Sequence, residues 1–135
     1  MNTPQDLLEL AKRLRVSGAE VDLRCAVSRA YYALFHFCNI YHSSLPFPGI
    51  AAPSGKGGDH FNLAHKLKNV APELSKHNPD LAIKSKQLGT VLDALRGQRH
   101  DADYDLYKTQ TLANCDMVLI AVEKRLLHST GPVSK

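Results

Sequence analysis

The chain has 135 residues, the size of one domain with a single hydrophobic core. Its net charge of +4 is only mildly basic and does not by itself predict an anionic partner. No apolar run approaches the roughly 20 residues that span a bilayer, and no basic segment followed by an apolar one opens the chain. The three cysteines are odd in number and lack paired spacing, which predicts reduced, mostly buried thiols. We therefore expect a cytoplasmic protein without a membrane segment.

The first half of the chain carries two helical patterns. Thr3 and Pro4 are typical of an N-cap and a first helical residue. Residues 17–20 match the capping box Ser-x-x-Glu, so a second helix is expected from near Ala19 to about His42. This helix has an apolar stripe and, beside it, a partly aromatic flank, which predicts a central position in a bundle or a dimer interface. The flank consists of Arg24, Ser28, Tyr31, Tyr32, Phe35 and His36.

The second half begins with a connection rich in Pro and Gly, residues 43–58, which we expect to be flexible. A short helix is expected over 59–70, with Pro72 ending it or bending the chain. Asn78 and Pro79 predict the start of a further helix, in which Gly89 is a weak point of about 1 kcal/mol relative to Ala.

A last helix is expected over 109–128, before a frayed tail, residues 129–135. The sequence therefore predicts one all-α domain over residues 1–135, with a core over about 4–128. It should be a bundle of four long helices and one short helix.

The most polar stretch of the chain, residues 99–105, lies where one helical pattern ends and the next has not begun. Continuing the earlier pattern at 3.6 residues per turn directs Arg99 toward other protein. Two interpretations stay open. In a structural lock, Arg99 pairs with a nearby carboxylate such as Asp103, and Tyr104 bonds across helices. In a phosphodiester site, Arg96 and Arg99 bind phosphate while His100 acts as an acid or base.

Metal chemistry has little support in the sequence, although the chain contains seven histidines. The pairs His36 with His42 and His60 with His65 are not spaced to place two ligands on one helical face. No paired cysteines or His-Glu-x-x-His pattern accompany them. We predict no metal site and no cofactor.

Two motifs together resemble the HEPN superfamily (higher eukaryotes and prokaryotes nucleotide-binding). The first is Ser28-Arg-Ala-Tyr-Tyr-Ala-Leu-Phe-His36, and the second, after the Pro/Gly-rich connection, is Arg99-x-x-Ala-Asp-Tyr-Asp105. The likeness covers about residues 5–128 and is greatest to the small stand-alone prokaryotic branch with an R-x-x-A-D-Y motif. It implies a HEPN-like bundle that dimerises. It also implies relatives that act as RNA-cleaving toxins, defence proteins or partners of minimal nucleotidyltransferases.

Active HEPN relatives carry an Arg and, a few residues later, a His, often just ahead of x-Tyr. In this chain Arg96 and Tyr104 match that pattern, but Ala102 stands where the His would fall, and His100 lies two residues upstream. The sequence therefore departs from the nuclease pattern at the His position.

Two functional hypotheses follow from the residues and the resemblance. In the first, a HEPN-type homodimer of a toxin–antitoxin or defence system binds RNA or a nucleotide. Its catalytic version is a metal-independent ribonuclease that uses Arg96, Arg99 and His100. The alternative is a non-catalytic interaction module that holds a partner protein such as a minimal nucleotidyltransferase. The residues expected to bind RNA or nucleotide, or to form a structural lock, are Arg24, Ser28, Tyr31, Tyr32, Asp103 and Tyr104.

Overall fold

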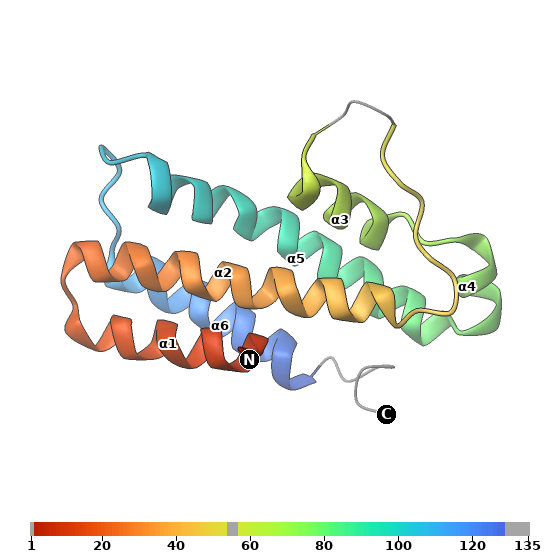
Figure 1. Cartoon of the computed structure of the whole chain (residues 1–135), viewed down its shortest axis with the longest axis horizontal. Coiled ribbons are helices and arrows are strands. Elements are labelled where there is room, and N and C mark those ends of the chain that lie inside the picture. The colour runs from red at the N-terminus through yellow and green to blue at the C-terminus, as the bar shows by residue number, and fades with distance from the viewer. Residues whose placement is uncertain (1, 54–56, 129–135) are drawn as a thin grey trace.

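The computed structural model describes residues 2–53 and 57–128. Within these ranges the chain forms α-helices and no strand (Figure 1), which confirms the all-α prediction. None of the described helices has both the length and the apolar character to cross a membrane. The predicted tail, 129–135, and the middle of the predicted flexible connection, 54–56, lie outside the described residues. The helices are α1 (Pro4–Ser17), α2 (Glu20–Ser43), α3 (Asp59–Lys68), α4 (Pro72–His77), α5 (Pro79–Tyr104) and α6 (Leu112–His128).

The described chain has one more helix than predicted, because Pro72 does not end a helix but begins one. It is the first residue of α4, where the fixed φ of proline suits the first turn and its missing N–H costs nothing. The capping box predicted for 17–20 is not formed, although the predicted start of a helix near Ala19 is confirmed, since α2 begins at Glu20. α1 continues through Ser17 and ends at Gly18, whose φ of 71° lies in the left-handed region that favours glycine. Ala19 then precedes α2 without a capping side chain.

The predicted starts of α1 and α5 are confirmed by their caps. Thr3 and Asp6 form a reciprocal capping box at α1. The Asn78 side chain accepts the Leu81 N–H at the start of α5, with Pro79 as the first helical residue. However, α5 extends to Tyr104, further than its apolar pattern alone predicted. Residues 99–104 of the polar stretch are therefore the end of α5 and not a connection, and Asp105 is the C-cap of the helix.

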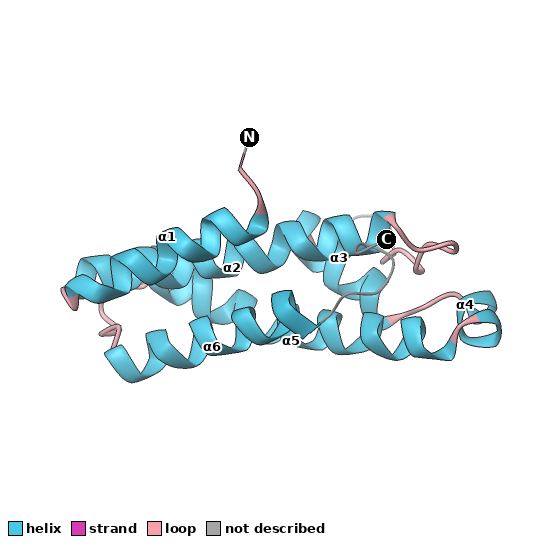
Figure 2. Ribbon diagram, turned by 90° about the horizontal axis from the view of Figure 1, so that it is seen from below, coloured by secondary structure: helices cyan, strands magenta, loops and turns pink. Residues whose placement is uncertain are grey.

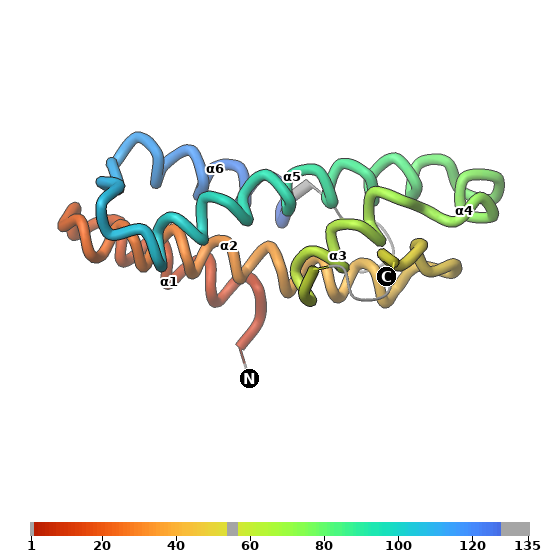
Figure 3. Tube along the Cα trace, turned by 90° about the horizontal axis from the view of Figure 1, so that it is seen from above, coloured from red at the N-terminus to blue at the C-terminus, as the bar shows by residue number. Residues whose placement is uncertain are grey.

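The long helices form two layers. α1 and α2 make one layer and α5 and α6 the other, while α3 lies beside α2 and α5 toward the end of the molecule that carries α4 (Figures 2 and 3). The core between the layers is apolar and includes two of the three cysteines, Cys38 and Cys115, whereas Cys25 is exposed. Its largest fully buried side chains are Tyr31, Tyr41, Leu8, Leu34, Leu67, Leu74, Leu88 and Leu92.

α3 approaches α5 closely at Gly89. A Cβ atom added to Gly89 would lie 2.8 Å from Lys68 Cγ and 2.9 Å from Leu67 Cβ on α3. It would also lie 3.0 Å from the Ala64 carbonyl oxygen. Near this crossing, the buried Ser85 hydroxyl donates to the Leu67 carbonyl at 2.8 Å. The glycine that weakens α5 as an isolated helix is therefore what allows α3 to pack against it.

Gly89→Ala is expected to lower the free energy of unfolding by about 1–3 kcal/mol, because the added methyl overpacks the α3–α5 contact. Gly97→Ala is the matched control on the same helix. An added Cβ at Gly97 meets no atom within 4 Å. That substitution should raise the free energy of unfolding by about 0.5–1 kcal/mol through helix propensity alone. Urea denaturation of both variants tests the contact, and equal stabilisation by the two would contradict it.

Candidate functional site

Arg24 on α2 binds the end of α5. Its side chain is buried, and Nη1 donates to the carbonyl oxygens of Asp101 at 3.3 Å, Ala102 at 3.1 Å and Asp105 at 3.0 Å. Nη2 donates to carbonyls of the following turn, Leu106 and Lys108. The last carbonyls of a helix lack partners within that helix, and the guanidinium supplies the donor that the Ala102 carbonyl needs. The carbonyls of Asp101 and Asp105 accept it in addition to the backbone N–H groups of Asp105 and Lys108.

Glu20 completes this arrangement from one turn before Arg24. Its carboxylate pairs with Arg24 Nε at 2.8 Å and accepts the Gln110 N–H at 2.8 Å. The hydrogen bond from Arg24 lowers the pKa of Glu20, as does the bond from Gln110. The Arg24 side chain is thus occupied in joining α2 to the α5–α6 connection, which is the structural-lock role for this residue.

Arg99 lies toward other protein, as its position in the helical pattern predicted. Its guanidinium carbon is 5.5 Å from the ring centroid of Tyr31, 5.7 Å from that of Tyr32 and 5.8 Å from that of Tyr104. Its ion pair with Asp103 is long, at 3.6 Å. The Nε atom is buried and has no hydrogen-bond partner among the described residues. Arg99 is therefore surrounded by aromatic faces and only loosely neutralised.

Asp103 also receives a hydrogen bond from the Ser28 hydroxyl of α2, at 3.2 Å. This bond directly links the sequence segments 28–36 and 99–105.

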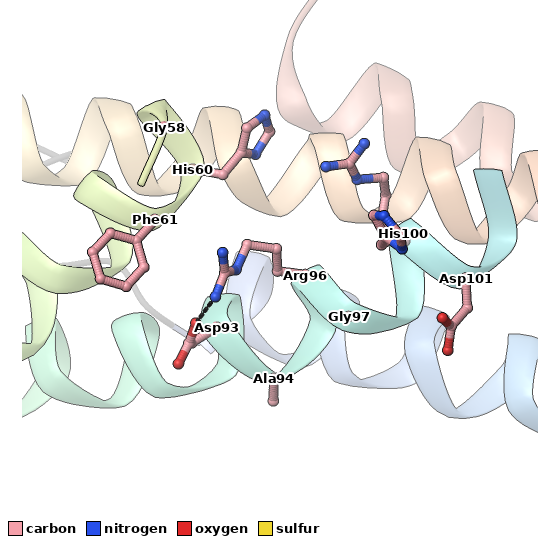
Figure 4. A pocket seen from close by; sticks show the side chains of 10 residues that line it. Gly58, His60, Phe61, Asp93, Ala94, Arg96, Gly97, His100 and Asp101 are labelled. Atoms are coloured by element: carbon pink, nitrogen blue, oxygen red, sulfur yellow. Dashed lines mark hydrogen bonds and ion pairs between the residues drawn. The ribbon is translucent and has the colours of Figure 1, made fainter. Parts of the chain in front are cut away.

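A cleft of about 590 Å³ lies between α3 and α5. In Figure 4, His60 and Phe61 reach it from α3, and Arg96 and His100 reach it from α5. The complete set of lining residues is Gly58, His60, Phe61, Asp93, Ala94, Arg96, Gly97, Arg99, His100 and Asp101. The three residues predicted to be catalytic, Arg96, Arg99 and His100, thus line one cleft.

Both carboxylates of the cleft are paired with lysines that do not line it. Asp93 binds Lys68 at 3.0 Å as well as Arg96 at 2.9 Å. The hydrogen bond from Lys68 is the largest cause that lowers the pKa of Asp93. Asp101 binds Lys108 at 3.1 Å. Since these lysines share the neutralisation of the carboxylates, the arginines of the cleft retain positive charge toward it.

His60 is the residue of the cleft that sequence reasoning missed. The Tyr31 hydroxyl lies 2.8 Å from His60 Nδ1, and the imidazole stacks on Phe35 with the centroids 4.2 Å apart. Burial lowers the pKa of His60, and the positive charges of Arg99 and Arg96 lower it further. In the sequence, His60 stands out only through its spacing to His65, which does not favour a metal site. The signal that could have found it is Gly89, because a glycine inside a helix marks a close approach by another element.

The remaining predicted residues lie around this site. His100 is exposed, and its ring lies beside Tyr104, with the centroids 5.1 Å apart. Tyr31, Tyr32 and Tyr104 surround Arg99 as described above. Ala102, where the resemblance would place a His, is buried with 3% of its surface exposed. A side chain at that position belongs to the core and not to the cleft.

The predicted dimer rested on the family resemblance and on the partly aromatic flank of α2. Within a single chain, however, Tyr31 is fully buried and Phe35 is stacked against His60 of α3. Much of that flank therefore has an intramolecular partner, and the dimer stays a prediction.

Comparisons of the chain with protein-family models, with curated proteins and with solved structures found no match. In the part of the chain that the structure describes, no three His, Cys, Asp or Glu side chains are grouped so that they could hold a metal ion.

Proposed function

We propose that this chain is a HEPN-type protein that binds a phosphate of RNA, or of a nucleotide, in the cleft between α3 and α5. The observation that carries the proposal is the convergence of Arg96, Arg99 and His60 on a cleft whose two carboxylates are already paired with outside lysines. An incoming phosphate would meet donors whose charge is not fully neutralised.

The two arginines suit phosphate for separate reasons. Arg96 donates a hydrogen bond from Nη2 to the Asp93 carboxylate, and its guanidinium carbon lies 5.6 Å from the Phe61 ring centroid. These two contacts limit the orientation of the guanidinium group. Arg99 is held among three tyrosine rings and makes one long ion pair. Planar guanidinium groups bind two phosphate oxygens at once, and a fixed orientation reduces the entropy lost on binding.

Tyr104 supports RNA over inorganic phosphate as the ligand. Tyr104 is 66% exposed, yet its ring lies next to both Arg99 and His100. An exposed aromatic face beside a phosphate-binding arginine is the arrangement on which bases of single-stranded RNA stack. A nucleotide bound through its phosphate would have this ring available for its base.

The proposal is tested by adding a short single-stranded oligoribonucleotide to ¹⁵N-labelled protein and following the backbone and side-chain resonances. The largest shifts are expected at the residues that line the cleft, including Arg96 and His60, and not on the outer face of α6 around Met117 and Ile120. The absence of shifts at millimolar RNA, or shifts confined to α6, would rule out the proposed site.

The catalytic version of the proposal assigns proton transfer to His100, which lines the cleft beside Arg99. In this version the 2′-hydroxyl of RNA attacks the adjacent phosphorus and the 5′-oxygen leaves, which produces a 2′,3′-cyclic phosphate and a 5′-hydroxyl. The same RNA is incubated with purified protein and the ends of any fragments are analysed. The version fails if the RNA stays intact or if His100→Ala cleaves it as fast as wild type.

The interaction-module alternative has one observation in its favour, at the turn after α5. Leu106 is 76% exposed and Tyr107 is fully exposed, so this corner presents apolar surface to a partner such as a nucleotidyltransferase. An RNA titration that leaves the cleft resonances unmoved would favour this alternative over the proposed function.

A further inference from the structure

The hydroxyl of Tyr31 is a buried donor that needs an acceptor. Tyr31 is fully buried, and burial raises the pKa of its hydroxyl, so the hydroxyl keeps its proton. Among the described residues, His60 Nδ1 at 2.8 Å is its hydrogen-bond partner, and no second acceptor is present for it. A buried O–H without an acceptor is costly. The O–H is therefore donated to Nδ1, which must then carry a lone pair.

This hydrogen bond fixes the form of the imidazole. A neutral imidazole has one N–H, so if Nδ1 accepts, the proton is on Nε2. Nε2 has no partner among the described residues and is not sealed from solvent, while the ring lines the cleft. The His60 N–H is thus free to bond to a ligand in the cleft shown in Figure 4.

The surroundings of His60 oppose its protonation. A second proton would have to enter at Nδ1, which would reverse the bond from Tyr31 and leave the buried hydroxyl without its acceptor. The positive charges of Arg99 and Arg96 on α5 also disfavour protonation of His60, whereas the carboxylate of Asp59 on α3 favours it. The titratable or charged groups that face the ring are Tyr31, Tyr32 and His36 on α2, Arg96 and Arg99 on α5, and Asp59 on α3.

We infer that His60 is a neutral N–H donor to a phosphoryl oxygen in the cleft, held in its Nε2-protonated form by Tyr31. This inference rests on the proposed phosphate-binding function of the cleft. Arg96 and Arg99 supply the charge, whereas His60 supplies a directed hydrogen bond from α3, the opposite side. A ligand bound to all three joins α3 to α5. His60 is a binding residue and Tyr31 is its positioning residue.

The tautomer is read by long-range ¹H–¹⁵N NMR of the imidazole rings in the wild-type protein. His60 is expected to carry its proton on Nε2. In Tyr31→Phe the bond to Nδ1 is lost, so the ring should become a mixture of tautomers and protonate at a higher pH than in wild type. His77 is the internal control, since it is exposed and stacks on Phe47, away from the cleft. Its resonances should be the same in both proteins.

Inorganic phosphate is the probe for binding. Phosphate is expected to shift the His60 Nε2–H resonance, and His60→Ala should weaken phosphate binding about 2- to 10-fold, the value of one neutral hydrogen bond. His60→Gln keeps an N–H donor of similar reach and should restore part of that loss. A proton on Nδ1 in the wild type, or a phosphate titration that leaves His60 unmoved, overturns the inference. If phosphate shifts His60 but RNA binds elsewhere, the proposed function fails while the role of His60 stands.

Discussion

Arg24→Ala is expected to lower the free energy of unfolding by about 3–5 kcal/mol, a large part of the stability of a domain of this size. The substitution removes the Arg24 donor from the Ala102 carbonyl at the end of α5, and it leaves the Glu20 carboxylate without Arg24. It also removes a second donor from the carbonyls of Asp101 and Asp105, which keep backbone N–H partners. A buried carbonyl that is left without a donor, as at Ala102, costs more free energy than its hydrogen bond contributed. Urea denaturation followed by circular dichroism measures the loss.

Two variants separate this lock from a general effect of charge. Arg24→Lys keeps the charge but not the planar fork, so it should recover only part of the lost stability. Arg13→Ala removes an exposed arginine of α1 and should change the free energy of unfolding by no more than about 0.5 kcal/mol. If Arg24→Ala unfolds at the same urea concentration as Arg13→Ala, Arg24 is not a lock.

Local signals in the sequence predicted the starts of α1 and α5 because the capping atoms lie within three residues of the groups that they cap. The capping box at 17–20 failed although its letters fit. Gly18 adopts the left-handed conformation that ends a helix, so α1 continues through Ser17, which therefore does not cap α2. The length of α5 was not predictable from its own residues, since its last carbonyls are bound by an arginine from 77 to 81 positions earlier in the chain.

The residues of the cleft also divide into those that were predictable from local sequence and one that was not. Arg96, Arg99 and His100 were predicted because they are close in sequence and share the end of one helix. His60 was not, because its place depends on the packing of α3 across Gly89 and on a hydroxyl of α2. The structural lock and the phosphate site, which were alternatives in the sequence, involve different arginines in the structure. Arg24 is bound to backbone carbonyls, whereas Arg96 and Arg99 line open space.

Arg99→Ala is expected to weaken RNA binding more than it lowers stability, whereas Arg24→Ala acts mainly on stability. The loss of stability should be about 1–2 kcal/mol, from a long ion pair and contacts with tyrosine rings. The loss of RNA affinity should be about 10- to 100-fold, since a charge-assisted hydrogen bond is worth about 1.5–3 kcal/mol. The dependence of log affinity on log salt should also fall by about 0.7 for one lost phosphate contact with single-stranded RNA.

The most direct test of the cleft is the affinity of a fluorescently labelled single-stranded RNA for wild type, Arg99→Ala and Arg13→Ala. Fluorescence anisotropy is measured at low and moderate salt, with each protein at a temperature where it is fully folded. Arg13→Ala removes the same charge from α1, away from the cleft, and controls for net charge. We predict that Arg99→Ala binds 10- to 100-fold more weakly and with a smaller salt dependence, while Arg13→Ala binds like wild type. Equal affinity of Arg99→Ala and Arg13→Ala for the RNA would contradict the assignment of this cleft as the phosphate site.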